Sequence, residues 1–321
     1  MLQLQESGNP AVIAGAQSPS RALAGSPAHN NYTPGEGLIH TLSLSRTAED
    51  LVRAGSGETV RWQGLTLRSY VQPIYSVREA GCVGFEALLR ATDEGGVTIR
   101  PDRLFEKARA DGDVVLLDWI CRALHLRKFA TIDRGDRKLF LNVHPEAAMR
   151  DARSVREFAD LVRYYGLDPT RLCLEVLEAP CADEGLLREA VLAYRGLGAS
   201  IAMDDFGVGR SNFDRIVALR PDVVKVDRSI LTRAVGDDAK ARRMLPSIIE
   251  LLHEAGAEVA IEGIESAGEA LVSIESGADH LQGFHFAAPS AHLPDEALTG
   301  GILAELLRMR GAPRLAVVGQ H

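Results

Sequence analysis

Short apolar runs alternate with amphipathic stretches along most of the chain. The runs span residues 69–75, 82–89, 138–143, 171–178, 199–205, 222–227, 258–263 and 279–284. The stretches between them, such as "VREFADLVRYYG" and "MLPSIIELLHEAG", carry apolar residues at helical spacing, and several end in Gly, as helices commonly do. Eight strands that alternate with helices predict a (β/α)₈ barrel of the TIM type. A doubly wound open sheet is the alternative, because the number of strands does not establish closure.

The pattern divides the chain into three parts. Residues 1–60 form a leader rich in Ala, Gly, Ser and Pro, which we expect to be mostly disordered because this composition buries little apolar surface. Within it, "TAEDLVRAG" predicts one short helix that begins after Thr47 and ends at Gly55. Residues 61–310 form the barrel domain, and residues 311–321 form a C-terminal tail.

Composition argues against several classes of function. A net charge of −8 disfavours binding to a nucleic-acid polymer, which needs clustered Lys and Arg. The four cysteines form no CxxC pair and no zinc-finger spacing, which indicates reduced structural thiols. The sequence has no run of about 18 apolar residues and no secretory signal, so we expect a cytoplasmic protein without a membrane segment.

Polar residues lie in or at the late end of the apolar runs. They are Glu86, Asn142, Glu175, Glu178, Asp204, Asp205, Lys225, Asp227, Glu262 and Gln282. In a (β/α)₈ barrel the carboxyl ends of the strands meet at one face, and the active site is built there. We therefore expect carboxylates and an Asn from separate strands to meet in one small volume.

Such a cluster needs compensating positive charge. Two unit charges about 4 Å apart repel by roughly 4 kcal/mol at an effective dielectric constant near 20. The candidate ligands are oxygen donors, which favours Mg²⁺ or Mn²⁺ over Zn²⁺. The adjacent Asp204 and Asp205 suit two ions about 3.5–4 Å apart, the arrangement that clamps the attacking and leaving oxygens of phosphoryl transfer. Lys225 is placed to orient or deprotonate a water there, or to stabilise charge on phosphorus oxygens.

Each residue also has an ordinary structural interpretation. A single Glu or Asp at a strand end often caps a helix or lies in solvent, and Asn142 alone is consistent with a turn cap. Lys225 and Asp227 could form an ordinary ion pair. The coincidence across six strands argues against these interpretations taken together. His144 and His285 are interpreted as core histidines and are left outside the site.

The same residues resemble the EAL domain, the family of bacterial cyclic di-GMP phosphodiesterases. "FEALLR" (85–90) contains the Glu-Ala-Leu signature. The other matching motifs are "QPI" at Gln72, "LNV" at Asn142, "LEVLE" at Glu175, "DDFG" at Asp204, "VVKVDRS" at Lys225, "EGIE" at Glu262 and "QGF" at Gln282. The resemblance covers about residues 65 to 290 and implies a modified barrel in which one strand runs antiparallel to the others.

The resemblance implies hydrolysis of one phosphodiester of cyclic di-GMP to linear pGpG, with Mg²⁺ or Mn²⁺ as cofactor. By motif, the metal ligands would be Glu86, Asn142, Glu175, Asp204, Asp205 and Glu262, with Asp227 supporting a second ion. Lys225 would act on the nucleophilic water, together with Glu86 and Glu262 as catalytic residues. The residues that contact the nucleotide or order its surroundings would be Gln72, Arg90, Glu265 and Gln282, and Glu178 would support a loop. A homodimer through the barrel is a further implication.

After "DDFG" the chain departs from the family pattern. The family usually continues Thr-Gly-Tyr-Ser-Ser, and this chain continues with Val208, Gly209, Arg210, Ser211 and Asn212. Leu177 also stands where Thr is usual, so two loop hydroxyls are missing. Three functions therefore stay open: an active phosphodiesterase, a weak or inactive EAL domain that acts as a cyclic di-GMP receptor or protein-interaction module, and a barrel metalloenzyme for another phosphodiester or a sugar phosphate.

Overall fold

The computed structural model describes residues 47–50, 52–53, 58–133, 135–148, 152–177, 183–208, 213–236, 239–293 and 295–309. Most of the predicted leader, the predicted tail, Glu178 and the loop segment 209–212 lie outside these residues. Residues 47–50 and 52–53 are helical.

The described residues contain one sheet of ten strands. The strands are β1 (Thr59–Trp62), β2 (Leu65–Ser76), β3 (Gly81–Thr92), β4 (Thr98–Ile99), β5 (Lys138–Asn142), β6 (Leu172–Leu177), β7 (Ser200–Phe206), β8 (Val223–Val226), β9 (Glu258–Ile261) and β10 (His280–Leu281). Their order is β1-β2-β10-β9-β8-β7-β6-β5-β3-β4, and a further pairing joins β2 to β3.

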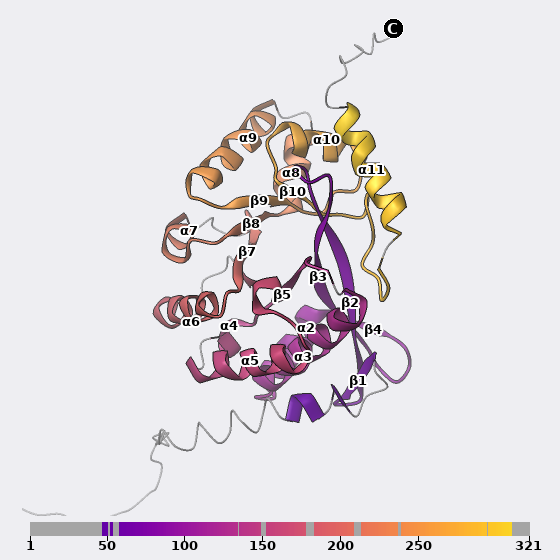
Figure 1. Cartoon of the computed structure of the whole chain (residues 1–321), viewed down its shortest axis with the longest axis vertical. Helices are drawn as coiled ribbons and strands as arrows, with labels where there is room; N and C mark the ends of the chain where they lie inside the picture. The colour runs from indigo at the N-terminus through magenta and orange to yellow at the C-terminus, as the bar shows by residue number, and fades with distance from the viewer. Residues whose placement is uncertain are drawn as a thin grey trace, which may run out of the picture.

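The β2–β3 pairing closes eight of these strands into a barrel (Figure 1). Strand β2 runs antiparallel to both of its barrel neighbours, β3 and β10. The remaining barrel neighbours, from β3 through β5 to β10, pair in parallel. The predicted modified barrel with one antiparallel strand is confirmed, and the alternative of an open sheet is wrong.

Helices follow the barrel strands and cover the outside of the sheet (Figure 1). They are α2 (Pro101–Ala110), α3 (Val114–Ile132), α4 (Pro145–Ala148), α5 (Ala152–Tyr164), η1 (Pro169–Arg171), α6 (Glu184–Gly196), α7 (Phe213–Leu219), α8 (Arg228–Val235), α9 (Ala239–Glu254), α10 (Ala267–Glu275) and α11 (Glu296–Met309). Among the described residues, none of these helices combines the length and apolar character needed to cross a bilayer.

All eight predicted apolar runs fall on the eight barrel strands. Strands β1 and β4 were not predicted from the sequence; both are short and pair antiparallel at the edges, β1 with β2 and β4 with β3. Most buried apolar side chains form one large cluster that includes Leu67, Trp119, Phe129, Phe158 and Ile249. A second, small cluster lies inside the barrel. Its members are Ile74, Phe140, Cys173, Ala202, Val223 and Ala260.

Candidate active site

Each of the eight barrel strands, or the residue that directly follows it, places one polar side chain at the same level of the barrel. These residues, called the polar layer here, are Gln72, Glu86, Asn142, Glu175, Asp204, Lys225, Glu262 and Gln282. The strand register aligns Gln72 with Glu86, and Asn142 with Glu175. The small apolar cluster lies two residues away along the same strands, so the period of two points both sets inward.

Lys225 occupies the centre of the polar layer and is fully buried. Its Nζ lies 2.6 Å from Glu175 Oε1 and 2.7 Å from Glu262 Oε1. It also lies 3.0 Å from Asp204 Oδ1 and 3.5 Å from Glu86 Oε2. Burial alone acts to lower the pKa of Lys225, but the surrounding carboxylates outweigh burial and raise that pKa well above its usual value. Lys225 is therefore an ammonium in this arrangement, which suits it to donate hydrogen bonds rather than to accept a proton.

The carboxylates around Lys225 carry more negative charge than one ammonium neutralises. Burial raises the pKa of Glu175 well above its usual value, and nearby carboxylates add to this effect. Burial and neighbouring carboxylates raise the pKa of Glu262 to about 8. Ionisation of either carboxyl therefore costs free energy in the folded protein, and a bound cation would offset that cost.

Two overlapping groups of carboxylates have the spacing of metal ligands. Glu86, Glu175 and Asp204 bring one oxygen each within 4.8 Å of one another, and so do Asp204, Asp205 and Glu262. Asp204 belongs to both groups. Asn142 joins the first group, because its Nδ2 donates to Glu175 Oε2 at 2.9 Å and to Glu86 Oε1 at 3.4 Å. The ligand atoms of both groups are carboxylate oxygens, which Mg²⁺ and Mn²⁺ prefer.

A backbone irregularity allows two adjacent aspartates to face the same site. Neighbouring residues of a regular strand point to opposite faces. The β7–β8 pairing shifts register between Met203 and Phe206, and Asp205 adopts a φ of 60°, in the left-handed region. Such a conformation costs about 1–3 kcal/mol for a residue other than Gly and is typical of functional sites. Burial, followed by the charge of Asp204, raises the pKa of Asp205 to about 6.

Asp227 lies beside this site but outside both carboxylate groups. It is the N-cap of α8, where its Oδ1 accepts a hydrogen bond from the backbone N–H of Ser229 at 2.8 Å. Its charge contributes to the raised pKa of Asp205, so the two carboxylates are neighbours. Asp227 therefore caps a helix, which is the ordinary structural role of a single acid at a strand end.

The four predicted nucleotide-binding residues divide into two pairs. Gln282 Nε2 donates to Glu86 Oε2 at 2.6 Å and to Gln72 Oε1 at 3.1 Å, so both glutamines order the polar layer. Arg90 lies four residues beyond Glu86 on β3, with its guanidinium 5.6 Å from the centre of the Tyr70 ring. Glu265 is exposed and forms an ion pair with Arg228. Arg90 and Glu265 therefore lie outside the polar layer.

A cavity of about 450 Å³ opens beside the carboxylates, between the ends of β3 and β5 and helices α2 and α3. Asn142, Asp204 and Asp205 line its inner side. Phe105 and His144 line another wall, with parallel rings 5.6 Å apart. This volume lies in the range of small-molecule sites.

This wall was not predicted from the sequence, and His144 was interpreted as a core histidine. The backbone N–H of His144 donates to Asp118 Oδ1 at 2.9 Å, and Asp118 Oδ2 lies 2.5 Å from Arg122 Nε. Asp118 and Arg122 are both buried in α3. A charged pair spaced four residues apart in the apolar first half of α3 was the available signal, because buried charges need partners.

Comparison with known proteins identifies the family. The family model described as EAL domain matches residues 61–289. The probable cyclic di-GMP phosphodiesterase PdeD of Escherichia coli K12 is 30% identical over 223 residues, which is 68% of this chain and 41% of PdeD. The cyclic di-GMP phosphodiesterase RocR of Pseudomonas aeruginosa is 27% identical over 231 residues, which is 69% of this chain and 57% of RocR. The chain thus aligns with about half the length of these relatives.

Solved structures show the same fold. The manganese and cyclic di-GMP complex of Klebsiella pneumoniae BlrP1 at pH 9.0 superposes with a TM-score of 0.62 at 24% sequence identity. This match covers 70% of this chain and 56% of the BlrP1 chain. The family model spans the whole barrel, and the chain is a member of the EAL domain family.

Proposed function

We propose that the protein is a metal-dependent phosphodiesterase that hydrolyses cyclic di-GMP to linear pGpG. The observation that carries this proposal is the pair of carboxylate groups that share Asp204. Two neighbouring ions are the arrangement that in-line phosphoryl transfer uses. Relatives named as cyclic di-GMP phosphodiesterases and a fold neighbour bound to manganese and cyclic di-GMP support the substrate and the metal.

The residues of this chain fit two Mg²⁺ or Mn²⁺ ions. Glu86, Asn142, Glu175 and Asp204 would hold one ion, while Asp204, Asp205 and Glu262 would hold the second, with Asp227 beside it. Such ions supply positive charge that activates water and offsets charge on the phosphorus oxygens. Every donor in this set is an oxygen atom, and Lys225 alone leaves the set with excess negative charge.

Lys225 would orient the attacking water and stabilise the transition state as a hydrogen-bond donor. The water oxygen forms a bond to phosphorus as the bond from phosphorus to the ribose O3′ breaks, and O3′ leaves with a proton. Gln282 and Gln72 would hold Glu86 in place through their hydrogen bonds. Arg90 and Glu265 would contact the nucleotide, and Glu178 would support the loop that follows β6; these three roles rest on the family motifs.

The test is hydrolysis of cyclic di-GMP with Mg²⁺ and with Mn²⁺, followed by chromatography of pGpG. We expect metal-dependent product from the wild-type protein and a loss of at least about 100-fold in Glu86→Ala. Glu94→Ala is the matched control, since its side chain is 75% exposed and pairs with Arg61 at the surface. An intact substrate at micromolar enzyme would contradict the proposal.

A receptor that binds cyclic di-GMP without turnover is the second candidate. Val208 in place of Thr and Arg210 in place of Tyr favour it, because the family's hydroxyl and ring are missing directly after the aspartate pair. Val208 is 62% exposed. Tight binding of cyclic di-GMP without pGpG would support this receptor, and no binding would indicate another phosphodiester as substrate.

A further inference from the structure

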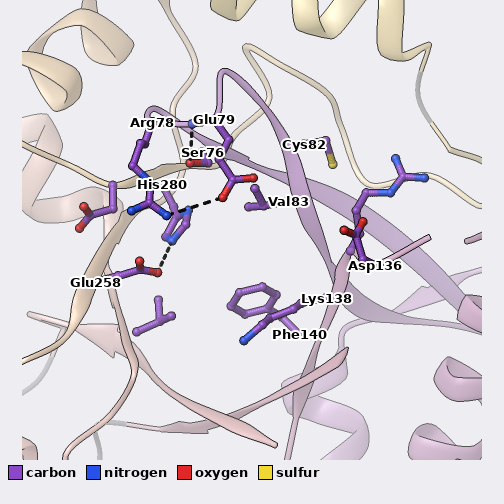
Figure 2. Close-up of a pocket in the computed structure, with 13 residues that line it drawn as sticks. Ser76, Arg78, Glu79, Cys82, Val83, Asp136, Lys138, Phe140, Glu258 and His280 are labelled. Carbon is purple, nitrogen blue, oxygen red and sulfur yellow. Dashed lines mark hydrogen bonds and ion pairs between the residues drawn. The ribbon is translucent and has the colours of Figure 1, made fainter. Parts of the chain in front are cut away.

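Figure 2 shows the residues that line a second cavity, of about 330 Å³. This cavity lies at the amino-terminal end of the parallel barrel strands, away from the polar layer. Its lining includes Ser76, Cys82, Lys138, Glu258 and His280. Ser76, Cys82, Lys138 and Glu258 each lie four residues from the member of the polar layer on their strand, so they form a lower level of the same barrel. Neither the family motifs nor the proposed activity uses this level.

The cavity exists because the barrel interior is under-filled at this end. Barrels of this type usually pack layers of bulky branched side chains. Here the small apolar cluster contains Cys173, Ala202 and Ala260, and Gly84 occupies the matching position of β3. A Cβ on Gly84 would lie 3.0 Å from the ring of Phe140, so that ring fills the space over the glycine and forms an apolar floor.

Lys138 is the group that most needs a ligand. Its side chain is half-buried, and its Nζ donates to the hydroxyl of Ser200 at 2.5 Å. No carboxylate of the described residues lies within ion-pair distance of this ammonium. Its neighbours are already paired: Arg137 with Asp133, and Asp279 with His253. A half-buried charge without a countercharge is costly, and an anion that reached Lys138 would relieve that cost.

His280 is a second polar residue of the lining. The residue is 9% exposed, and its Nε2 lies 2.9 Å from Glu258 Oε2. The Nδ1 of the same ring is buried and has no hydrogen-bond partner among the described residues. Figure 2 shows His280, Lys138 and Phe140 around the same space. Hydrogen-bonding groups above an apolar floor are the composition of a small-molecule site.

We propose that this cavity binds a small organic monocarboxylate whose planar apolar body lies against Phe140 and whose carboxylate pairs with Lys138. A monoanion fits better than a dianion such as a phosphate ester, because the lining also carries the carboxylates of Glu79, Asp136, Glu258 and Asp279. A cavity of about 330 Å³ is near the lower limit for ligand sites, which selects a ligand of about one ring. The site is separate from the polar layer and does not depend on the proposed hydrolysis.

Cys82 provides a local readout. It lines the cavity and is partly exposed, while Cys121 and Cys173 are buried. The experiment measures the alkylation rate of Cys82 by peptide mass spectrometry, with benzoate, benzyl alcohol or benzylamine present. We expect benzoate to slow alkylation with a millimolar Kd, as suits a probe of this size, and the neutral and cationic analogues to bind at least about tenfold more weakly.

Lys138→Met is expected to weaken protection by benzoate at least about tenfold, with Lys107→Met unchanged. Lys107 is an exposed lysine of α2 and serves as the matched control. Circular dichroism checks that each variant folds, and the probe series on the wild-type protein tests the proposal without any variant. Equal protection by the three probes, no protection by benzoate up to about 10 mM, or full protection in folded Lys138→Met would each overturn the proposal.

Discussion

At the residue scale, we expect Lys225 to have two separable roles in the polar layer, one in stability and one in hydrolysis. Its ammonium is fully buried among the carboxylates of Glu86, Glu175, Asp204 and Glu262. Removal of one partner from a buried charge cluster typically costs about 3–5 kcal/mol. We therefore expect Lys225→Met to lower the free energy of unfolding by about that amount in chelator, and to lower hydrolysis at least about 100-fold with metal present.

Denaturant titrations with and without Mn²⁺ separate these roles. Added Mn²⁺ should restore much of the lost stability, because the ion supplies the missing positive charge, while hydrolysis should stay low. Lys107→Met should match the wild-type protein in both assays. Hydrolysis at the wild-type rate in Lys225→Met would exclude a role for the ammonium in the reaction.

Glu262 predicts a pH dependence of stability. Its pKa rises from the usual 4.5 to about 8 in the folded protein. Between these values the folded state binds more protons than the unfolded state, so the free energy of unfolding falls as pH rises. One pKa unit corresponds to about 1.4 kcal/mol, and we expect a fall of at least that size between pH 5 and pH 8 in chelator.

The measurement is the difference in unfolding free energy between wild-type and Glu262→Gln protein at pH 5, 6, 7 and 8, without divalent ions. The variant cannot ionise at this position, so its advantage over the wild-type protein should grow with pH. Glu94→Gln should show a constant difference. An advantage of Glu262→Gln that does not change with pH would show that Glu262 titrates normally.

The sequence predicted the members of the polar layer better than it predicted the nature of their contacts. Strand ends of a barrel must converge, so the convergence of Asn142, Glu262 and Gln282 was predictable from their positions alone. The cap formed by Asp227 and the ion pair of Glu265 depend on the helices that begin after β8 and β9. Phe105 and His144 meet only after α2 packs on the barrel, and no local pattern indicates that contact.

At the element scale, the end of β7 determines how the two aspartates are presented. Gly207 follows them with a φ of 101°, and a Cβ there would lie 2.3 Å from Ile230 Cδ1. Gly207→Ala is therefore expected to strain the backbone and to clash with the Ile230 side chain of α8. We expect a loss of about 2–4 kcal/mol in unfolding free energy and weaker Mn²⁺ binding, since Asp204 and Asp205 must move with the loop.

Gly166→Ala is the matched control for backbone strain. Gly166 has a φ of 69°, and nothing lies within 4 Å of its Cβ position. Its alanine variant should lose about 1 kcal/mol and keep Mn²⁺ affinity. In Gly207→Ala, the further change Ile230→Ala should recover Mn²⁺ affinity by removing the clash. Unchanged affinity in Gly207→Ala would separate the loop from the metal site.

The end of β7 also has a conformation that the sequence pattern does not predict. The apolar run at 199–205 predicted the strand to within one residue of its observed bounds. Strict alternation would send Asp204 and Asp205 to opposite faces, because side chains repeat every two residues. The positive φ that brings them together belongs to an Asp, a residue that carries no signal as strong as that of Gly.

At the scale of the whole molecule, the barrel was predictable because its period is repeated eight times and each repeat supports the others. Closure was not predictable from that period. It depends on β2 pairing antiparallel with β3 on one side and β10 on the other, and β10 is only two residues long. The family motifs supplied the antiparallel strand, which the apolar pattern alone does not indicate.

We expect metal binding to stabilise the whole barrel, because the members of the polar layer come from all eight barrel strands. A ligand that binds only the folded state at 100 times its Kd stabilises that state by about 2.7 kcal/mol. For a domain of this size, each kcal/mol shifts the melting temperature by about 2–4 °C, so Mn²⁺ or Mg²⁺ should raise the melting temperature by about 5–10 °C.

The measurement is a thermal melt in chelator and in each ion. Glu86→Ala should lose most of the shift and Glu94→Ala should keep it. A wild-type melt that neither ion moves would mean that the carboxylates do not hold a metal, and the proposed chemistry would lose its basis.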